Sequence, residues 1–266
     1  MPNRQRSFRL EGVVLSHHDW GEADRLITLF SRERGKLRAI AKGARKPRSR
    51  KAGHLEPFNR VSLLLAQGRD LPLITQAETL KTHAAFQEDL LWMGYGAYLL
   101  ELIDRFTVEE EANPALYQLL LETLERLSQS QQPSFELRYF EVKFLDEVGY
   151  RPQFFHCVVC QAAIQPQDQF FSCEMGGVVC PECAVQQRSL QPVSVQALRY
   201  LRHFQRSAYP EAQRAKIPPP TLKEMEGLLR LYLQSILERG LNTPKFIHSI
   251  AQLKEPQAES SGTNNP

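Results

Sequence analysis

The stretch "DRLITLFSRERGKLRAIAKG", residues 24–43, decides the fold, because it contains two short aliphatic runs joined by a tight turn at Arg34-Gly35. Runs of this length and composition are typical of β-strands. Similar runs occur on either side of it: "RLEGVVLSH" (9–17), "RVSLLLAQ" (60–67) and "LPLITQAE" (71–78). Five short strands within residues 1–80 predict a small barrel, with the oligonucleotide-binding (OB) fold as the leading candidate and an SH3-like barrel as the alternative.

The charge of the chain is distributed unevenly. Residues 1–80 contain 16 Lys and Arg against 8 Asp and Glu, whereas residues 81–266 contain 17 against 22, so the net charge of +3 conceals a basic first part. Such asymmetry is typical of a polyanion-binding domain joined to a part with another task. No apolar run approaches the ~20 residues that span a bilayer, and no signal peptide is visible. We therefore expect a cytoplasmic protein without membrane contact, associated with the nucleoid if its polyanion is DNA.

The most basic stretch, "KGARKPRSRKAG" (42–53), lies between the third and fourth predicted strands, where we expect an exposed loop. It carries six cations: Lys42, Arg45, Lys46, Arg48, Arg50 and Lys51. Such a loop neutralises phosphates without sequence preference, which favours contact with DNA over a merely solvated charge run or a localisation signal. We expect Arg25, Arg34 and Arg38 to continue the positive surface. Trp20, in a predicted polar loop, is the aromatic residue that we expect to stack on a base.

Residues 81–253 have a helical pattern. Asn113-Pro114 pairs a capping residue with proline at the first helical position, which predicts a helix start. Thr221 and Glu224 are spaced as a capping box before a later helix that Gly240 is expected to end. Residues 254–266 have no apolar periodicity and are predicted to be disordered.

Two cysteine pairs interrupt the helical part. Cys157-x-x-Cys160 and Cys180-x-x-Cys183 are separated by 19 residues, the spacing of a four-cysteine zinc site. Each pair places two thiolates on one tight knuckle, and two knuckles together form the tetrahedral sulfur cage that Zn²⁺ prefers. The alternative is four reduced cysteines in an apolar plug. Four ligands close the coordination shell, so we interpret the zinc as structural rather than catalytic.

Two neighbouring side chains are further candidates for the metal site. Cys173 is the odd cysteine, which we expect to be a packed thiol, although it has the chemistry to replace one of the four. His156 precedes the first pair and is a second possible ligand. The resulting prediction is an α+β multidomain chain: an OB-fold barrel at 1–80, an all-α domain at 81–253 with a zinc-knuckle insertion at 154–186, and a tail at 254–266.

Catalytic motifs are missing from the sequence. There is no phosphate-binding Gly-x-x-x-x-Gly-Lys-Ser/Thr loop, no dinucleotide-type glycine fingerprint and no Gly-x-Ser-x-Gly elbow. We therefore expect a protein that is not an enzyme and does not use ATP. A nuclease, the enzymatic alternative, requires a carboxylate cluster for Mg²⁺, and the sequence shows no such cluster.

Three segments resemble the RecO family of bacterial DNA repair proteins. They are "GEADRLITLFSRERGKLRAIAKGARKPRSRKAGHLEPF" (21–58), "LRYFEVKFLDEVGY" (137–150), and "FSCEMGG" between the cysteine pairs. The resemblance implies an OB-fold domain, a helical domain and, in many members, a zinc-binding insertion. It also implies that the chain binds single- and double-stranded DNA and anneals complementary strands. With RecR, it would help to load RecA on DNA coated by single-strand-binding protein.

The helical part contains a candidate partner site. Arg199, Arg202 and Arg206 follow the predicted cap Ser194 at helical spacing, so they share one face. The acidic C-terminal tail of single-strand-binding protein is a partner that such a face would fit, and an exposed helix face without a partner is the simpler interpretation. A zinc-stabilised OB-fold protein that binds RNA is the alternative function, and it would prefer RNA through contacts with the 2′-hydroxyl group.

Overall fold

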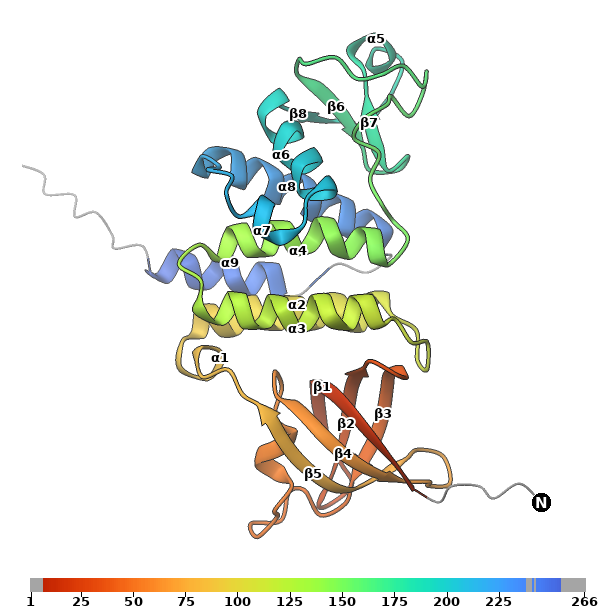
Figure 1. The fold of residues 1–266 in the computed structure, drawn as a ribbon, viewed down its shortest axis with the longest axis vertical. Helices are drawn as coiled ribbons and strands as arrows, with labels where there is room; N and C mark the ends of the chain where they lie inside the picture. The colour runs from red at the N-terminus through yellow and green to blue at the C-terminus, as the bar shows by residue number, and fades with distance from the viewer. Residues whose placement is uncertain (1–6, 238–240, 242, 255–266) are drawn as a thin grey trace, which may run out of the picture.

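In the computed structural model, which describes residues 7–237, 241 and 243–254, the elements form a barrel, a stack of helices and a small sheet. The barrel and the small sheet lie at opposite ends of the molecule, with the helices between them (Figure 1). Within the described part of the chain, no helix is both long and apolar enough to cross a membrane.

The barrel has five strands: β1 (Ser7–Trp20), β2 (Asp24–Ser31), β3 (Gly35–Ala41), β4 (Arg60–Ala66) and β5 (Leu73–Lys81). They close in the order β1-β2-β3-β5-β4, with β1 paired to both β2 and β4. A register shift between Val14 and Ser16 allows the long β1 to curve between its two partners. A 3₁₀ turn, η1 (Ala52–Leu55), lies between β3 and β4. This arrangement confirms the predicted OB fold.

Period-2 alternation fills the barrel. Inward side chains from every strand form one apolar cluster: Leu10, Val14, Ile27, Leu29, Leu37, Ala39, Val61, Leu63, Leu65 and Ile74 among them. Other barrel residues, Val13, Leu15 and Phe30, belong instead to the large core of the helical part. The barrel therefore has a core of its own and also shares one with the helices.

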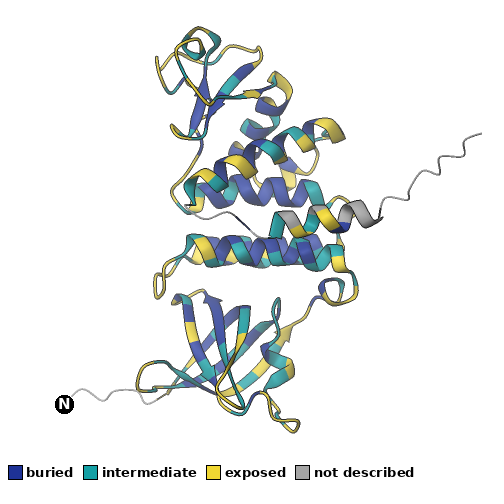
Figure 2. Cartoon of the chain, turned by 180° about the vertical axis from the view of Figure 1, so that it is seen from behind, coloured by how far each residue is buried: buried dark blue, intermediate teal, exposed yellow. Residues whose placement is uncertain are grey.

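The helices before the insertion are α1 (Ala85–Glu88), α2 (Leu90–Phe106), α3 (Pro114–Gln129) and α4 (Pro133–Glu147). Asn113 caps α3 by accepting a hydrogen bond from Leu116 N, and Pro114 occupies the first turn, as predicted. The buried face of α3 contains Leu116, Leu120, Leu124 and Leu127. Figure 2 shows buried residues along the helices that lie between the barrel and the small sheet.

The helices after the insertion are α6 (Val195–Arg206), α7 (Tyr209–Ala212), α8 (Pro219–Ile236) and α9 (Thr243–Lys254). The predicted capping box is wrong, because α8 begins at Pro219 and Thr221 is buried within its first turn. Glu224 instead accepts bonds from the backbone N–H and the hydroxyl of Ser194, the cap of α6. Helix α9 packs on α2 and was not predicted. Gly240 and residues 255–266 lie outside the described residues.

The insertion contains β6 (Gln169–Ser172), β7 (Gly177–Val179), α5 (Pro181–Ala184) and β8 (Gln191–Val193). The strands form a sheet in the order β7-β6-β8, so the inserted sheet continues beyond residue 186. Phe154 and Phe171 are fully buried, and Phe171 packs edge-on against Tyr232 of α8. The base of the insertion is therefore part of the main core.

The barrel is fastened to the helices by close backbone contact. Gly35 has a φ of +60°, and a Cβ atom there would lie 1.8 Å from the carbonyl oxygen of Glu111. Next to it, the N–H of Glu110 donates to the carbonyl of Lys36 at 2.8 Å. On the other side, Phe58 (φ +71°) packs its ring against Gly96 and Phe86. The contact with Glu111 leaves no room for a side chain at Gly35.

Candidate nucleic-acid interface and metal centre

The basic loop between β3 and η1 is held against the β1–β2 turn. The N–H of Gly43 donates to Asp24 Oδ1 at 2.7 Å, and the N–H of Arg45 donates to the carbonyl of Ala23 at 2.9 Å. The guanidinium of Arg45 pairs with Asp19 at 3.2 Å and also bonds carbonyl oxygens of the turn. The two loops therefore form one surface, at the end of the barrel away from the helices (Figure 1).

Two of the six predicted cations support the loop itself. Arg45 is bound to the β1–β2 turn, and the ammonium group of Lys51 donates to the carbonyl of Ile74 at 3.0 Å. Burial lowers the pKa of Lys51, although Asp24 opposes the shift. Ala44 and Leu55 are buried in the barrel core, which fixes both ends of the loop. The loop is therefore braced by its own residues.

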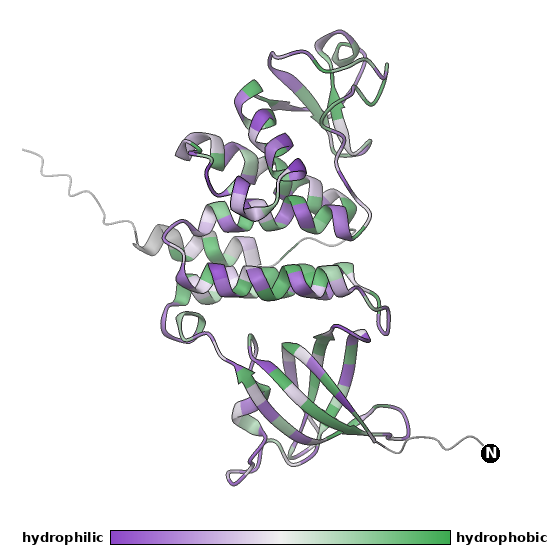
Figure 3. Cartoon of the chain, viewed as in Figure 1, coloured by the Kyte–Doolittle hydropathy of each residue, from purple (hydrophilic) through white to green (hydrophobic). Residues whose placement is uncertain are grey.

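The other four cations of the loop are exposed: Lys42, Lys46, Arg48 and Arg50. None of them has an ion-pair or hydrogen-bond partner for its side chain among the described residues. The loop at the lower end of the barrel is largely hydrophilic in Figure 3, whereas the strands above it alternate between hydrophobic and hydrophilic residues. Four unpaired cations on a braced loop form a surface suited to phosphate.

Trp20 lies beside this loop, but the prediction of a polar loop for it is wrong. It is the last residue of β1, paired with Asp24 across the hairpin, and the residue is 48% exposed. The preceding residue, Asp19, is the partner of Arg45, which places Trp20 next to the base of the basic loop. An exposed indole at this position is accessible to an unpaired base, and aromatic side chains commonly stack on such bases.

The remaining predicted cations are engaged within the protein. Arg25 pairs with Glu56 at 2.9 Å and is largely covered. The guanidinium of Arg34 lies 4.1 Å from the centroid of the Phe8 ring. Arg38 pairs with Glu109, which comes from the connection between α2 and α3. Sequence reasoning missed these glutamates because each lies far from its arginine along the chain.

Glu56 contacts the side chains of both Arg25 and His17. It accepts from Arg25 and lies 3.0 Å from His17 Nε2. Burial alone would raise the pKa of Glu56, but the bonds from Arg25 and His17 outweigh burial and lower it. Glu56 is therefore ionised at neutral pH and neutralises the charge of Arg25. Arg25 contributes less free charge to the surface than the sequence indicates.

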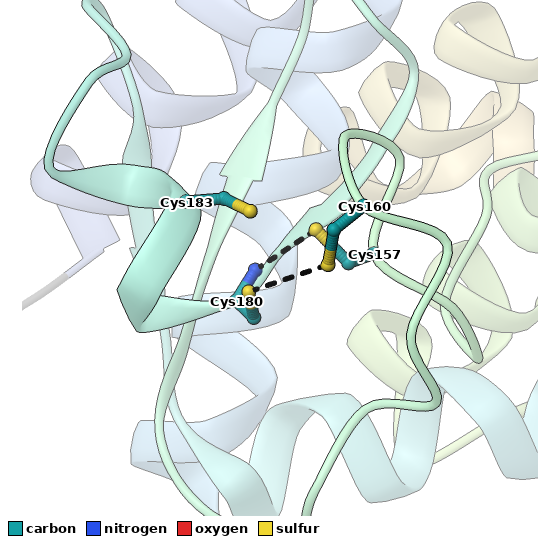
Figure 4. Close-up of side chains that lie close together, drawn as sticks. All are labelled: Cys157, Cys160, Cys180 and Cys183. Carbon is teal, nitrogen blue, oxygen red and sulfur yellow. Dashed lines mark hydrogen bonds between the residues drawn. The ribbon is translucent and has the colours of Figure 1, made fainter.

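The four predicted metal ligands come together at the tip of the insertion. The sulfur atoms of Cys157, Cys160, Cys180 and Cys183 all lie within 4.8 Å of one another. Cys160 Sγ and Cys180 Sγ are 3.9 Å apart, close to the roughly 3.8 Å expected for two thiolates bound to Zn²⁺ at about 2.3 Å. Figure 4 shows the four side chains pointing toward one another from two knuckles. The donor set and its spacing fit a tetrahedral metal site.

Backbone geometry makes the knuckles. The N–H of Val158 donates to Val178 O at 2.9 Å, which places the first knuckle beside β7. Gln161 has a φ of +63°, so the chain reverses directly after Cys160. Cys180 precedes α5 and donates its N–H to Cys157 Sγ at 3.4 Å. The second knuckle is therefore aligned with the first by main-chain bonds.

The protonation of the cysteines is uneven. Burial would raise the pKa of Cys157, but N–H donors from Cys160, Cys180 and Val159 lower it to about 6. The pKa of Cys183 is raised, chiefly by the neighbouring sulfur of Cys180. Four thiolates repel one another at this distance, and a divalent cation removes that repulsion.

Neither of the further candidate ligands belongs to the sulfur cluster. Cys173 packs against the helical core, where burial raises the pKa of its thiol. His156 forms a backbone bridge to Ala163, and its imidazole is not among the four grouped ligands. The cluster is therefore a four-cysteine set.

The predicted arginine face on α6 is divided in the structure. Arg202 Nε donates to Phe154 O at 2.8 Å, so this residue holds the insertion to the helix. The guanidinium of Arg206 lies 3.8 Å from the centroid of the Phe155 ring, at the edge of a hollow that Arg151 and His156 also line. Arg199 instead stacks on Tyr200. Only Arg206 remains both exposed and beside an opening.

Comparison with known proteins places both parts of the chain in one family. A family model described as "Recombination protein O N terminal" matches residues 5–83, and one described as "Recombination protein O C terminal" matches residues 87–245. A protein named DNA repair protein RecO from Roseiflexus sp. (strain RS-1) is 37% identical over 97% of this chain and 91% of its own length. The protein of that name from Bacillus subtilis (strain 168) is 30% identical over 95% of this chain and 98% of its own length.

Proposed function

The chain belongs to the RecO family of DNA repair proteins, and from that premise we propose that it is a DNA-binding recombination mediator that anneals complementary single strands without ATP. With RecR, it would help to load RecA on DNA coated by single-strand-binding protein. The observation that carries the DNA-binding part is the group of four unpaired cations beside an exposed tryptophan at the free end of the OB barrel.

The chemistry of this surface suits a protein that must accept any sequence. Lys42, Lys46, Arg48 and Arg50 would neutralise phosphates and release condensed counterions, which provides affinity for single and double strands alike. Trp20 would add stacking on unpaired bases and so favour single strands. Nothing in these contacts reads a base edge, which is what a mediator without sequence preference requires.

Annealing needs no catalytic residue. Two complementary strands repel each other through their phosphates, and a shared positive surface offsets that repulsion while base pairing supplies the driving free energy. No covalent bond breaks, so we propose that the protein is not an enzyme. We also propose that it acts in the cytoplasm, at the nucleoid.

We assign the four cysteines to a structural Zn²⁺. A four-thiolate shell would leave no position for substrate, and the ion would stabilise the knuckles by relieving the repulsion between sulfur atoms.

The proposal for the acidic tail of single-strand-binding protein now rests on Arg206, because the guanidinium of Arg202 donates to the carbonyl of Phe154. The test measures the affinity of the tail peptide for Arg206→Glu, with Arg199→Glu as the control. If Arg206→Glu binds the peptide as well as Arg199→Glu does, the assignment is wrong. Titration with purified RecR tests that partner.

The decisive experiment is annealing of complementary strands coated with single-strand-binding protein, without ATP. One variant replaces the four exposed cations with Gln or Ser: Lys42, Lys46, Arg48 and Arg50. We expect it to lose annealing and most of its DNA affinity at low salt, with its melting temperature unchanged, because none of these side chains supports the fold.

Two outcomes would contradict the proposal. If wild type fails to anneal, the mediator function is wrong. If the four-cation variant anneals as well as wild type, the DNA surface lies elsewhere. The RNA-binding alternative is tested with the same strand as RNA at equal salt, since a preference for RNA would indicate contacts with the 2′-hydroxyl group.

A further inference from the structure

The connection between α2 and α3 runs along strand β3 of the barrel. Glu109 forms a parallel bridge with Lys36, and the N–H of Glu110 donates to Lys36 O. The turn before β3 approaches so closely that only glycine fits at position 35. Lys36 also donates to the carbonyl of Asp104, at the end of α2. Residues 109–111, "EEE", are therefore an acidic strap whose main chain is fixed on the barrel.

This strap lies on the part of the barrel that OB folds commonly use for oligonucleotides, the face of β2 and β3. Arg38 is on that face, opposite Thr28 of β2, and about half of its side chain is exposed. Its Nε atom lies 2.7 Å from Glu109 Oε1. A phosphate that approached this Nε–H would have to replace the carboxylate, and one that approached the remaining guanidinium N–H groups would meet its negative charge.

We propose that Glu109 is an internal competitor for phosphate at Arg38, so that the β2–β3 face is closed to single-stranded DNA and the strand is confined to the free end of the barrel. The inference rests on the proposed DNA-binding function. It adds a residue that restricts the path of the strand.

Glu109 competes with phosphate mainly because its main chain is fixed on β3, and the strength of the ion pair contributes less. An exposed ion pair contributes little to stability, and a phosphate in solution can match it. Glu109, however, is carried by a main chain already bonded to β3, so it is present at Arg38 without an association cost. Glu110 and Glu111 add negative charge at the same edge. A DNA strand would therefore meet repulsion there as well as a filled site.

The test compares Glu109→Gln with Glu110→Gln. Both substitutions remove one negative charge from the strap, but the side chain of Glu110 is exposed and has no partner within the described residues. Glu109→Gln should lower the Kd for an oligo-dT strand by roughly two- to fivefold at low salt, the range of one exposed ion pair. It should also steepen the salt dependence by about 0.7, the slope of one added phosphate contact on a single strand. Glu110→Gln should change the Kd much less.

A second pair of variants shows whether Arg38 is responsible. Arg38→Ala alone should leave the Kd nearly unchanged, because Glu109 already occupies this arginine. Combined with Glu109→Gln, it should abolish the gain. The inference is overturned if Glu110→Gln gives the same gain, if the gain persists without Arg38, or if Glu109→Gln changes nothing while wild type binds DNA. Failure of wild type itself to bind would overturn the proposed function instead.

Discussion

Trp20 and Trp92 are the two tryptophans of the chain, and their environments differ sharply. Trp92 donates its indole N–H to Leu127 O at 3.0 Å and packs against Tyr95 within the helices. Trp20 is about half exposed beside the basic loop. The helical pattern of the sequence predicted a helix for Trp92, which lies in α2. The location of Trp20 was not predicted, because a tryptophan after two histidines and an aspartate has no periodic pattern that separates a strand end from a loop.

This difference allows stacking to be measured at a single residue. In a Trp92→Phe protein, Trp20 is the only tryptophan, and we expect single-stranded DNA to quench its fluorescence because the indole stacks on a base. Trp20→Ala should weaken binding to single strands by about 1–3 kcal/mol, and binding to duplex DNA much less. Fluorescence titration and anisotropy check these two results. Unchanged emission at saturating DNA would show that Trp20 does not stack.

At the scale of elements, the insertion has two parts that should respond differently to loss of the proposed zinc ion. The knuckles carry the four cysteines, whereas Phe154 and Phe171 are buried against the helices. Chelation should therefore accelerate hydrogen exchange in the knuckles and leave α6 and α8 protected. Acidification should release the metal as well, because protons compete with zinc for the thiolates.

Matched cysteine variants test the same element. Cys160→Ser should reduce bound zinc below one ion per chain, because it removes one ligand of the cluster, while Cys173→Ser should retain the ion. Metal analysis of the purified proteins gives the answer. Loss of zinc from Cys173→Ser would mean that the fifth cysteine is a ligand and that the assigned set is wrong.

Elements differ in how far the sequence could predict them. The barrel strands were predictable because their alternation and turn glycines are local. Helix α9 was missed although Pro244 stands in its first turn, as Pro114 does in α3. The spacing of Thr221 and Glu224 wrongly predicted a capping box. Glu224 instead bonds to Ser194, which is 30 residues away along the chain and cannot be predicted from a local pattern. The cysteine spacing predicted the four-cysteine cluster because a knuckle needs only four consecutive residues.

At the scale of the whole molecule, the junction between barrel and helices depends on Gly35. Gly21 and Gly35 have nearly equal φ values of +59° and +60°, but only Gly35 faces a backbone atom within 4 Å. Alanine at either position carries the cost of about 1–2 kcal/mol for left-handed backbone. Gly35→Ala must also move the strap away from β3, so we expect it to be less stable than Gly21→Ala by at least about 1 kcal/mol.

Thermal denaturation of the two alanine variants measures this difference. Equal loss of stability would show that the junction tolerates a side chain and that the barrel is not fastened at this turn. A larger loss for Gly35→Ala would confirm that close backbone contact, rather than the surrounding ion pairs, sets the position of the barrel.

Helix α9, the last helix described, packs on α2, the first long one; a Cβ at Gly94 would lie only 3.0 Å from Ile247 Cγ1. The helical part is therefore closed by residues from both of its ends, whereas the barrel uses only a continuous segment up to Lys81. During synthesis, domains fold as their residues leave the ribosome, N-terminal parts first. The barrel is thus complete while most of the helices are still to be translated. The helical part can close only after residues 243–254 have emerged.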